Sequence, residues 1–114
     1  MREHDWKIHE YMGNDLTGWE WHSENKFVAV RYDKMTYMDI PQYSTTWEGA
    51  GLVMEAASKQ DLVLVYEITA ISHETGSITY EGRFDGMTHN VRASSLPELI
   101  YKAYISAMEE RDNG

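Results

Sequence analysis

The alternation of apolar and polar positions separates this chain into strand-like and helix-like segments. The strongest strand-like segment is Leu62 to Ser72, in which both faces begin with apolar side chains. Because strands with two apolar faces are usually covered on both sides, this pattern predicts a central strand. A second strand is predicted from Ile78 to Phe84, and the Asp85-Gly86 pair after it favours a hairpin turn. A third strand from Thr88 to Ala93 would complete an antiparallel meander.

A helix is predicted before this meander. Pro41 ends the preceding strand, because proline cannot donate to a β-ladder. Thr45 and Glu48 then have the spacing of a capping box, which satisfies free backbone donors at the start of a helix. Apolar and small residues recur behind this cap at helical spacing and form the predicted buried stripe, which consists of Trp47, Ala50, Gly51, Met54 and Ala57.

A second capped helix is predicted after the meander. Ser95 and Glu98 repeat the capping-box spacing, and Pro97 is tolerated in the first helical turn. A broad apolar face then extends from Leu99 to Met108. This helix is expected to pack on the sheet and close the fold.

The N-terminal third predicts shorter elements. Arg2 to Met12 is expected to form a short helix. Trp19 and Trp21 alternate with polar residues as on a short strand. Lys26 to Tyr32 is rich in β-formers, and Met35 to Asp39 is expected to return as its antiparallel partner.

Together these elements predict an α+β fold. An antiparallel β-meander sheet with an additional hairpin is expected to pack with the two capped α-helices and the short N-terminal helix. With 114 residues the chain is long enough for one hydrophobic core, so residues 1–114 are expected to form a single domain.

The charge balance changes which partners are expected. The chain has 19 acidic and 10 basic side chains, which gives a formal net charge of −9. This charge repels phosphate backbones and disfavours direct binding of nucleic acid, whereas it suits a basic protein surface. The simpler interpretation is that net negative charge keeps a small protein in solution.

Cysteine is absent from the sequence. Disulfides, thiol catalysis and thiolate metal sites are therefore excluded. No long apolar run and no apolar signal core occur, so the protein is expected to be cytoplasmic and without a membrane partner.

Two segments carry a resemblance to a known family. Ile40-Pro41-Gln42-Tyr43-Ser44-Thr45 leads into the first capped helix, and Ala93 to Ala103 contains the cap and first turns of the second. Both resemble segments of the phage ABA sandwich domain, a family of small bacteriophage and prophage proteins. This chain departs from the family pattern at Thr46 and Gly51, where the family usually has an acidic residue and often a tryptophan. The resemblance implies an αβα sandwich in a phage accessory protein, and the family has no established common activity.

Hydroxyl and imidazole side chains do not predict catalysis. Ser44-Thr45-Thr46 and Ser94-Ser95 are explained as helix caps, and no glycine-rich phosphate loop occurs. Asp5 and His9 would share a helix face, but no third ligand is specified, so no metal site is expected. The chain is therefore expected to be neither an enzyme nor a cofactor-binding protein.

Paired carboxylates are the remaining candidate for acid–base chemistry. Glu67 and Glu81 would face each other across adjacent strands, where like charges destabilise a sheet. Arg83, two positions after Glu81, would be placed to neutralise the pair. A structural pair is the simpler interpretation.

Aromatic and acidic side chains are the candidate binding residues. The rings would gather either as part of the core or as a partner-binding face, and Tyr37 and Tyr43 are expected to be exposed. Glu48 and Glu55 would lie on the same solvent side of their helix, because seven residues return a side chain to nearly the same direction. The candidate binding set consists of Trp19, Trp21, Tyr37, Tyr43, Glu48 and Glu55.

These observations support three hypotheses. The first is a phage-encoded accessory protein that binds a host protein without catalysis and inhibits a nucleic-acid-handling defence factor. The second is a small-ligand-binding or sequestering protein with an aromatic pocket near Trp19, Trp21 and Tyr43. The third, a hydrolase or nuclease, would need a clustered carboxylate–histidine site. The sequence leaves the oligomeric state open, and a homodimer is compatible with it.

Overall fold

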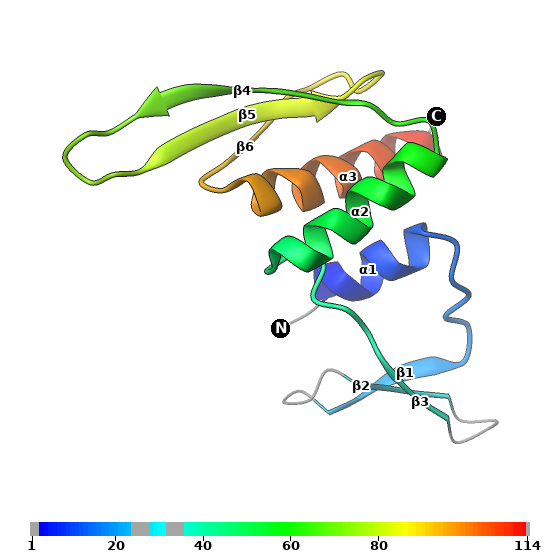
Figure 1. The fold of residues 1–114 in the computed structure, drawn as a ribbon. Coiled ribbons are helices and arrows are strands. Elements are labelled where there is room, and N and C mark those ends of the chain that lie inside the picture. Colours follow the sequence, from blue (N-terminus) through cyan, green and yellow to red (C-terminus); the bar gives the residue numbers. More distant parts are fainter. Residues whose placement is uncertain (1–2, 24–27, 32–35, 114) are drawn as a thin grey trace.

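A computed structural model of the chain describes residues 3–23, 28–31 and 36–113 as three helices and two antiparallel sheets (Figure 1). The helices are α1 (Glu3–Tyr11), α2 (Trp47–Lys59) and α3 (Leu96–Asn113). The strands are β1 (Trp19–Ser23), β2 (Val28–Arg31), β3 (Thr36–Asp39), β4 (Leu64–Ile71), β5 (Ile78–Phe84) and β6 (Val91–Ala93). The predicted α+β class is confirmed.

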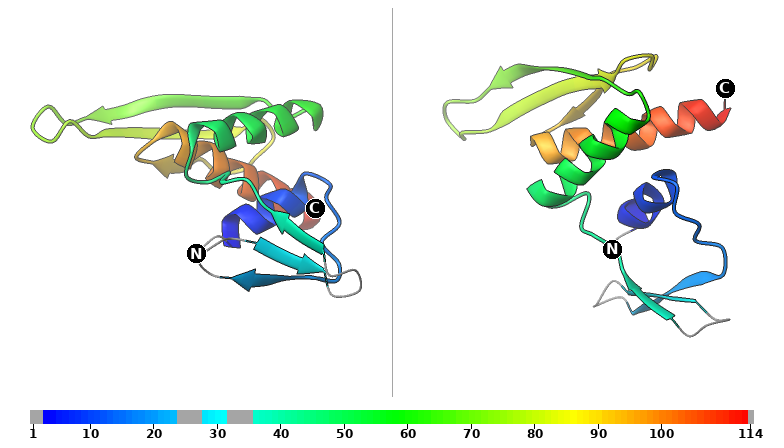
Figure 2. Two further views of the ribbon diagram at one scale, coloured as in Figure 1. Left: turned by 60° about the horizontal axis from the view of Figure 1, so that its bottom comes forward. Right: turned by 45° about the vertical axis from the view of Figure 1, so that its right-hand side comes forward.

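The larger sheet has the strand order β4-β5-β6, and both strand pairs are antiparallel. Leu64 lies opposite Phe84, and Gly82 lies opposite both Tyr66 and Val91, so the predicted meander is confirmed. Helix α3 packs against β5 and β6 on one face of this sheet, and α1 and α2 pack in turn against α3 (Figures 1 and 2).

The opposite face of the larger sheet is open. Val65, Arg83 and Arg92 share this face through the strand register, and all three are exposed. The αβα layering that the family resemblance implies would need a helix here. The described helices all lie on the other side (Figure 2). No described helix therefore covers the second face of the larger sheet.

The smaller sheet has the order β1-β2-β3 and lies beyond α1, away from the larger sheet (Figure 1). Trp21 lies opposite Ala29, and Val30 lies opposite Tyr37. The smaller sheet therefore contains the predicted hairpin of β2 and β3 together with a third strand, β1, which pairs with β2. Residues 24–27 and 32–35, into which the predicted strands and their connections extend, lie outside the described residues.

The core lies between the three helices and the inner face of the larger sheet. The rings of Phe84 and Tyr104 meet edge to face with their centroids 6.4 Å apart, an arrangement that the aromatic quadrupole favours. The Tyr104 hydroxyl donates to Gln60 Oε1 over 2.7 Å, so its polar end is satisfied inside the core. The fully buried apolar side chains of greatest volume are Tyr104, Phe84, Ile8, Leu99 and Val53.

Helix α3 begins as the sequence predicts. The Glu98 N–H donates to Ser95 Oγ over 3.3 Å, and the Leu99 N–H donates to the Ser95 carbonyl over 3.0 Å. The Glu98 carboxylate accepts from the Ser94 N–H and from Lys102. Ser95 is therefore the cap, and the carboxylate reaches one residue further back than a capping box requires.

Helix α2 differs from its prediction in its cap and in its buried stripe. Thr46, and not Thr45, is the N-cap, because its Oγ1 accepts from the Gly49 N–H over 2.9 Å. The predicted burial of Trp47 and Gly51 is wrong, since both are exposed. The residues of α2 that are buried are Gly49, Ala50, Val53 and Ala57.

Strand β4 is the edge of the larger sheet and not the central strand that its two apolar faces predict. Every residue of β4 except Leu64 is exposed, because α3 covers β5 and β6 but does not extend over β4. The β4–β5 hairpin projects beyond the helices (Figure 1). The radius of gyration is accordingly 15.6 Å, against about 13 Å for a compact domain of this length.

Candidate functional site

The outer face of α2 combines an exposed tryptophan with two carboxylates. Trp47, Glu48, Leu52 and Glu55 define this α2 outer face, and all four are exposed. Glu48, Leu52 and Glu55 follow one another at spacings of four and three residues, so their side chains share one direction. Trp47 stands beside them in the first turn and is 67% exposed. Because tryptophan is usually well buried, its exposure here indicates a contact surface.

An open hollow of about 300 Å³ lies beside the α2 outer face. Glu55 forms an ion pair with Lys59 at its rim, with 3.6 Å between the charged atoms. The hollow brings together two of the predicted binding residues, Tyr43 and Glu55. Its lining consists of Met12, Tyr43, Leu52, Glu55, Ala56, Lys59 and Gln60.

Tyr43 is buried, and the prediction that it is exposed is wrong. The side chain is only 4% exposed because α1 covers it. The Tyr43 hydroxyl lies 2.7 Å from His9 Nδ1, and the two rings stack with centroids 5.9 Å apart. Burial lowers the pKa of His9 below its ordinary value, which favours the neutral imidazole. Tyr43 is therefore first a support for α2, with one edge at the hollow.

Asp5 and His9 share the face of α1 that contacts the segment before α2. Asp5 is fully buried, and its Oδ1 accepts from the Ser44 N–H over 2.8 Å. His9 meets the neighbouring Tyr43. These contacts give both side chains a structural role. Within the described ranges, no group of three or more His, Cys, Asp or Glu residues is placed to hold a metal ion.

The other predicted aromatic residues belong to the smaller sheet. Trp19 is half-buried at the start of β1, whereas the side chains of Trp21 in β1 and Tyr37 in β3 lie outside the described part of the structure. Among the described residues that line the hollow, Tyr43 is the one aromatic ring. The hollow beside the α2 outer face therefore contains Tyr43 without Trp19.

The predicted carboxylate pair is present on the open face of the larger sheet. Glu67 lies directly opposite Glu81 in the β4–β5 register. Arg92, and not Arg83, neutralises the pair, because Arg92 lies opposite Glu81 on β6 with 3.7 Å between the charged atoms. Arg83 lies opposite Val65 instead. The row from Glu67 to Arg92 is a cross-strand structural contact.

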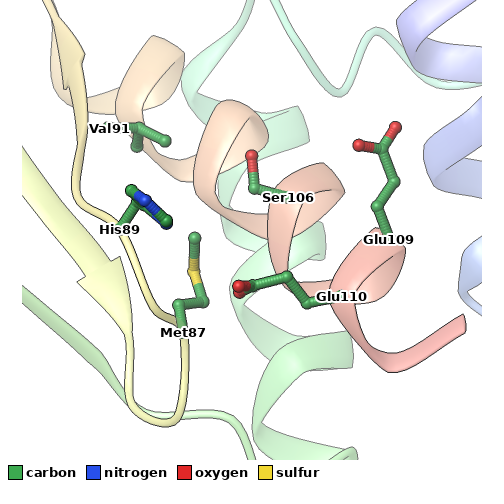
Figure 3. Close-up of a pocket in the computed structure, with 6 residues that line it drawn as sticks. All are labelled: Met87, His89, Val91, Ser106, Glu109 and Glu110. Carbon is green, nitrogen blue, oxygen red and sulfur yellow. The ribbon is translucent and has the colours of Figure 1, made fainter. Parts of the chain in front are cut away.

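A second hollow, of about 270 Å³, lies between the β5–β6 connection and the last turns of α3 (Figure 3). The Thr88 hydroxyl donates to Glu110 Oε1 and therefore accepts from His89 Nδ1 over 2.7 Å. The hydroxyl and the N–H of Thr88 both donate to Glu110 Oε1, and these two hydrogen bonds lower the pKa of Glu110 below its ordinary value because they stabilise the carboxylate. The residues labelled in the figure are Met87, His89, Val91, Ser106, Glu109 and Glu110.

This carboxylate–threonine–histidine chain was missed by the sequence analysis, because Thr88 and Glu110 are 22 residues apart and match no spacing motif. In this hydrogen-bonded chain, the proton that His89 donates to Thr88 lies on Nδ1. Ser106 lies across the hollow (Figure 3), but no hydrogen bond joins it to His89 among the described residues. In this arrangement His89 therefore does not activate the Ser106 hydroxyl through a direct hydrogen bond.

Comparisons with known proteins were made for the whole chain. No protein-family model matches it, and neither a curated protein nor a solved structure matches it significantly. Within the described residues, no helix is both long enough and apolar enough to cross a lipid bilayer.

Proposed function

We propose that this protein binds a partner protein through the α2 outer face, without catalysis. The observation that carries this proposal is the exposed Trp47 in the first turn of α2, beside Glu48 and near the exposed Leu52. Tryptophan buries a large area with few rotatable bonds, and such residues dominate the binding energy of many interfaces. The α2 outer face therefore has the apolar anchor of an interface together with a polar rim.

The partner is a protein with a basic surface. Glu48 and Glu55 stand on either side of Leu52 along α2, and the whole chain has a net charge of −9. Opposite charges across an interface speed encounter and fix the relative orientation of the two proteins. A host protein that handles nucleic acid in defence presents such a surface. The phage origin in this proposal rests on the family resemblance of Ile40–Thr45 and Ala93–Ala103.

The proposal is tested with an affinity-tagged protein and a lysate of the bacterial host. The wild-type protein is expected to retain one specific host protein, and Trp47→Ala is expected to bind it about 30-fold more weakly, because truncation of an interface anchor costs about 2 kcal/mol or more. Titration calorimetry with the purified partner measures this difference. The affinity is expected to fall with salt, and the double variant Glu48→Gln/Glu55→Gln is expected to reduce that salt dependence.

A matched control is Val63→Ala. Val63 is 63% exposed, close to the exposure of Trp47, but it lies in the segment before β4 and not on α2. Its truncation is expected to leave partner binding unchanged. Equal binding by the wild-type protein and Trp47→Ala would contradict the proposal, as would the absence of any retained host protein.

Small-ligand binding is the second candidate, and the hollow beside the α2 outer face is the observation that favours it. Its volume of about 300 Å³ is at the lower end of the range for ligand pockets. Lys59 and Gln60 supply polar groups beside Tyr43 and Met12. A ligand that raises the melting temperature of the wild-type protein, but not that of Leu52→Trp, would favour this candidate over a protein partner.

A further inference from the structure

The backbone of β4 has a hydrogen-bonding edge that no strand of the described chain covers. β4 is the first strand of the order β4-β5-β6. The Asp85 N–H donates to the Val63 carbonyl over 2.7 Å, which shows that the backbone of Val63 points toward β5. Because this direction alternates along a strand, Val65 and Glu67 also point toward β5. The N–H and C=O groups of Leu64, Tyr66 and Ile68 therefore point outward.

The side chains along this edge are mostly apolar. Tyr66, Ile68 and Ile71 are about half exposed on the face that carries the helices, and Val65 is exposed on the other face. Natural edge strands are usually protected by lysine, proline, a β-bulge or a covering element. Residues 64–71 contain neither lysine nor proline, and the irregularity in the β4–β5 register comes after Ile68, so Leu64, Tyr66 and Ile68 precede it. An uncovered apolar edge of this kind indicates that another strand pairs with it.

The chain exposes more surface than a compact monomer of its size. The accessible surface is 7365 Å², which is about 950 Å² more than a compact monomer of 13.2 kDa exposes. A stable protein interface buries about 800 Å² of each partner. Part of this excess comes from the projecting β4–β5 hairpin (Figure 1).

We propose that a second copy of this chain pairs with β4 and forms a symmetric dimer with a continuous six-stranded antiparallel sheet. The strand order would be β6-β5-β4-β4-β5-β6. A two-fold axis perpendicular to the sheet relates the two copies, so their helices lie on the same face. This dimer does not depend on the proposed function of the α2 outer face.

The side chains of β4 select the register of this pairing. With Tyr66 at the two-fold axis, Leu64 lies opposite the partner's Ile68, and Glu67 lies opposite the partner's Val65. Each of the three outward-pointing residues then exchanges backbone hydrogen bonds with the other copy. With Glu67 at the axis, two carboxylates would lie directly opposite each other, and such a pair destabilises a sheet. The register centred on Tyr66 avoids this repulsion.

The direction of β4 favours a second copy over an unrelated strand. β4 runs from the helical body at Leu64 to the projecting end of the hairpin at Ile71 (Figure 1). In an antiparallel pair, the projecting end of each hairpin lies alongside the body of the other copy. The exposed Ile68 and Ile71 of one copy are thereby brought toward the helical side of its partner. The same strand supplies both halves of the contact, as a two-fold interface requires.

Size-exclusion chromatography with light scattering and sedimentation velocity test the proposal on the intact protein. The wild-type protein is expected to reach twice the chain mass of 13.2 kDa as its concentration rises. Ile68→Lys is expected to raise the dimer dissociation constant about tenfold or more, because it removes two apolar cross-strand pairs and places charge at the edge. Thr75→Lys adds the same charge in the exposed hairpin turn and is expected to leave the dissociation constant unchanged.

Single cysteines test the register, since the chain has no cysteine of its own. Tyr66→Cys is expected to form a cross-linked dimer on mild oxidation, because about 5.5 Å between the paired Cα atoms is within the range that a disulfide spans. Thr75→Cys is expected to cross-link far more slowly. A wild-type protein that stays monomeric at every concentration would overturn the proposal. A dimer that is insensitive to Ile68→Lys, or that cross-links equally through either cysteine, would also overturn it. Protection of the β4 edge by a different protein, with no dimer, would do the same.

Discussion

Two glycines in α2 differ in what surrounds them. A Cβ built on Gly49 would lie 2.1 Å from the Gln42 carbonyl oxygen and 2.6 Å from Tyr43 Cα. A Cβ built on Gly51 would meet nothing within 4 Å. Gly49 therefore lets the start of α2 lie directly against the backbone of the preceding segment. Gly51 has no such role and only lowers helix propensity.

Opposite effects on stability are expected from the same substitution at these two positions. Gly51→Ala is expected to stabilise the protein by about 0.5–1 kcal/mol, because alanine loses less backbone entropy in a helix. Gly49→Ala is expected to destabilise it by about 1–3 kcal/mol, because the backbone at Gln42 must move. Urea unfolding of both variants measures the difference. Destabilisation of similar size by both substitutions would contradict this account of the packing.

At the scale of the element, the start of α2 depends on one threonine. Thr46 Oγ1 accepts from the Gly49 N–H over 2.9 Å and donates to the Gln42 carbonyl over 2.9 Å. It thus joins the helix to the segment that Gly49 contacts. The preceding Thr45 is exposed, and its hydroxyl makes only a 3.4 Å contact with the Gln42 side chain.

Thr46→Ala is therefore expected to lower the free energy of unfolding by about 1–2 kcal/mol, because it removes the helix cap and its link to Gln42. Thr46→Ser keeps the hydroxyl and is expected to restore most of this loss. Thr45→Ala serves as the matched control and is expected to change stability by less than about 0.5 kcal/mol. Thermal and urea unfolding check all three variants. A larger effect at Thr45 than at Thr46 would show that the capping box of the sequence prediction is correct.

The helices were predictable from sequence because their signals are local. Ser95, Pro97 and Glu98 specify the start of α3 through atoms within one turn, and Gly86 takes the positive φ of +97° that its turn requires. The choice between Thr45 and Thr46 was not predictable, because either hydroxyl can cap a helix. The packing of Gln42 on Gly49 decides it, and that contact is tertiary.

Whether β4 is buried or exposed could not be predicted from its own residues. Apolar side chains on both faces of Leu62–Ser72 are compatible with a central strand and with an edge strand that another chain covers. β4 is an edge strand because it pairs with β5 alone among the described strands, and it is exposed because α3 lies over β5 and β6. The exposure of Tyr43 and of Trp47 also depends on tertiary packing. Tyr43 was expected to be exposed but is covered by α1, and Trp47 was expected to be buried but is exposed on α2.

At the scale of the whole molecule, the two proposed contact surfaces lie on different elements. The α2 outer face belongs to the helical layer, whereas the β4 edge belongs to the larger sheet (Figure 2). A dimer through β4 would carry two α2 outer faces, one from each copy. A partner with two binding sites would then be held more tightly than one α2 outer face alone allows, provided that both sites are reached at once.

The single charge within β4 has a consequence for the solubility of the protein. Glu67 is the one charged residue in the segment Leu62–Ile71, which otherwise has the composition of a fibril-forming strand. A carboxylate in such a segment acts as a gatekeeper, because stacking many copies in register would stack the charge as well. Pairing of two chains is compatible with this charge, whereas growth into a fibril is opposed by it.

Glu67→Gln is therefore expected to aggregate several-fold faster than the wild-type protein on agitation, with a rise in thioflavin T fluorescence. Glu81→Gln is the matched control, because Glu81 lies on the inner strand β5 and is already paired with Arg92. Its aggregation rate is expected to stay close to that of the wild-type protein. Equal rates for the two variants would show that Glu67 has no special role. If Glu67→Gln forms fibrils, one carboxylate separates a defined assembly of this chain from an unlimited one.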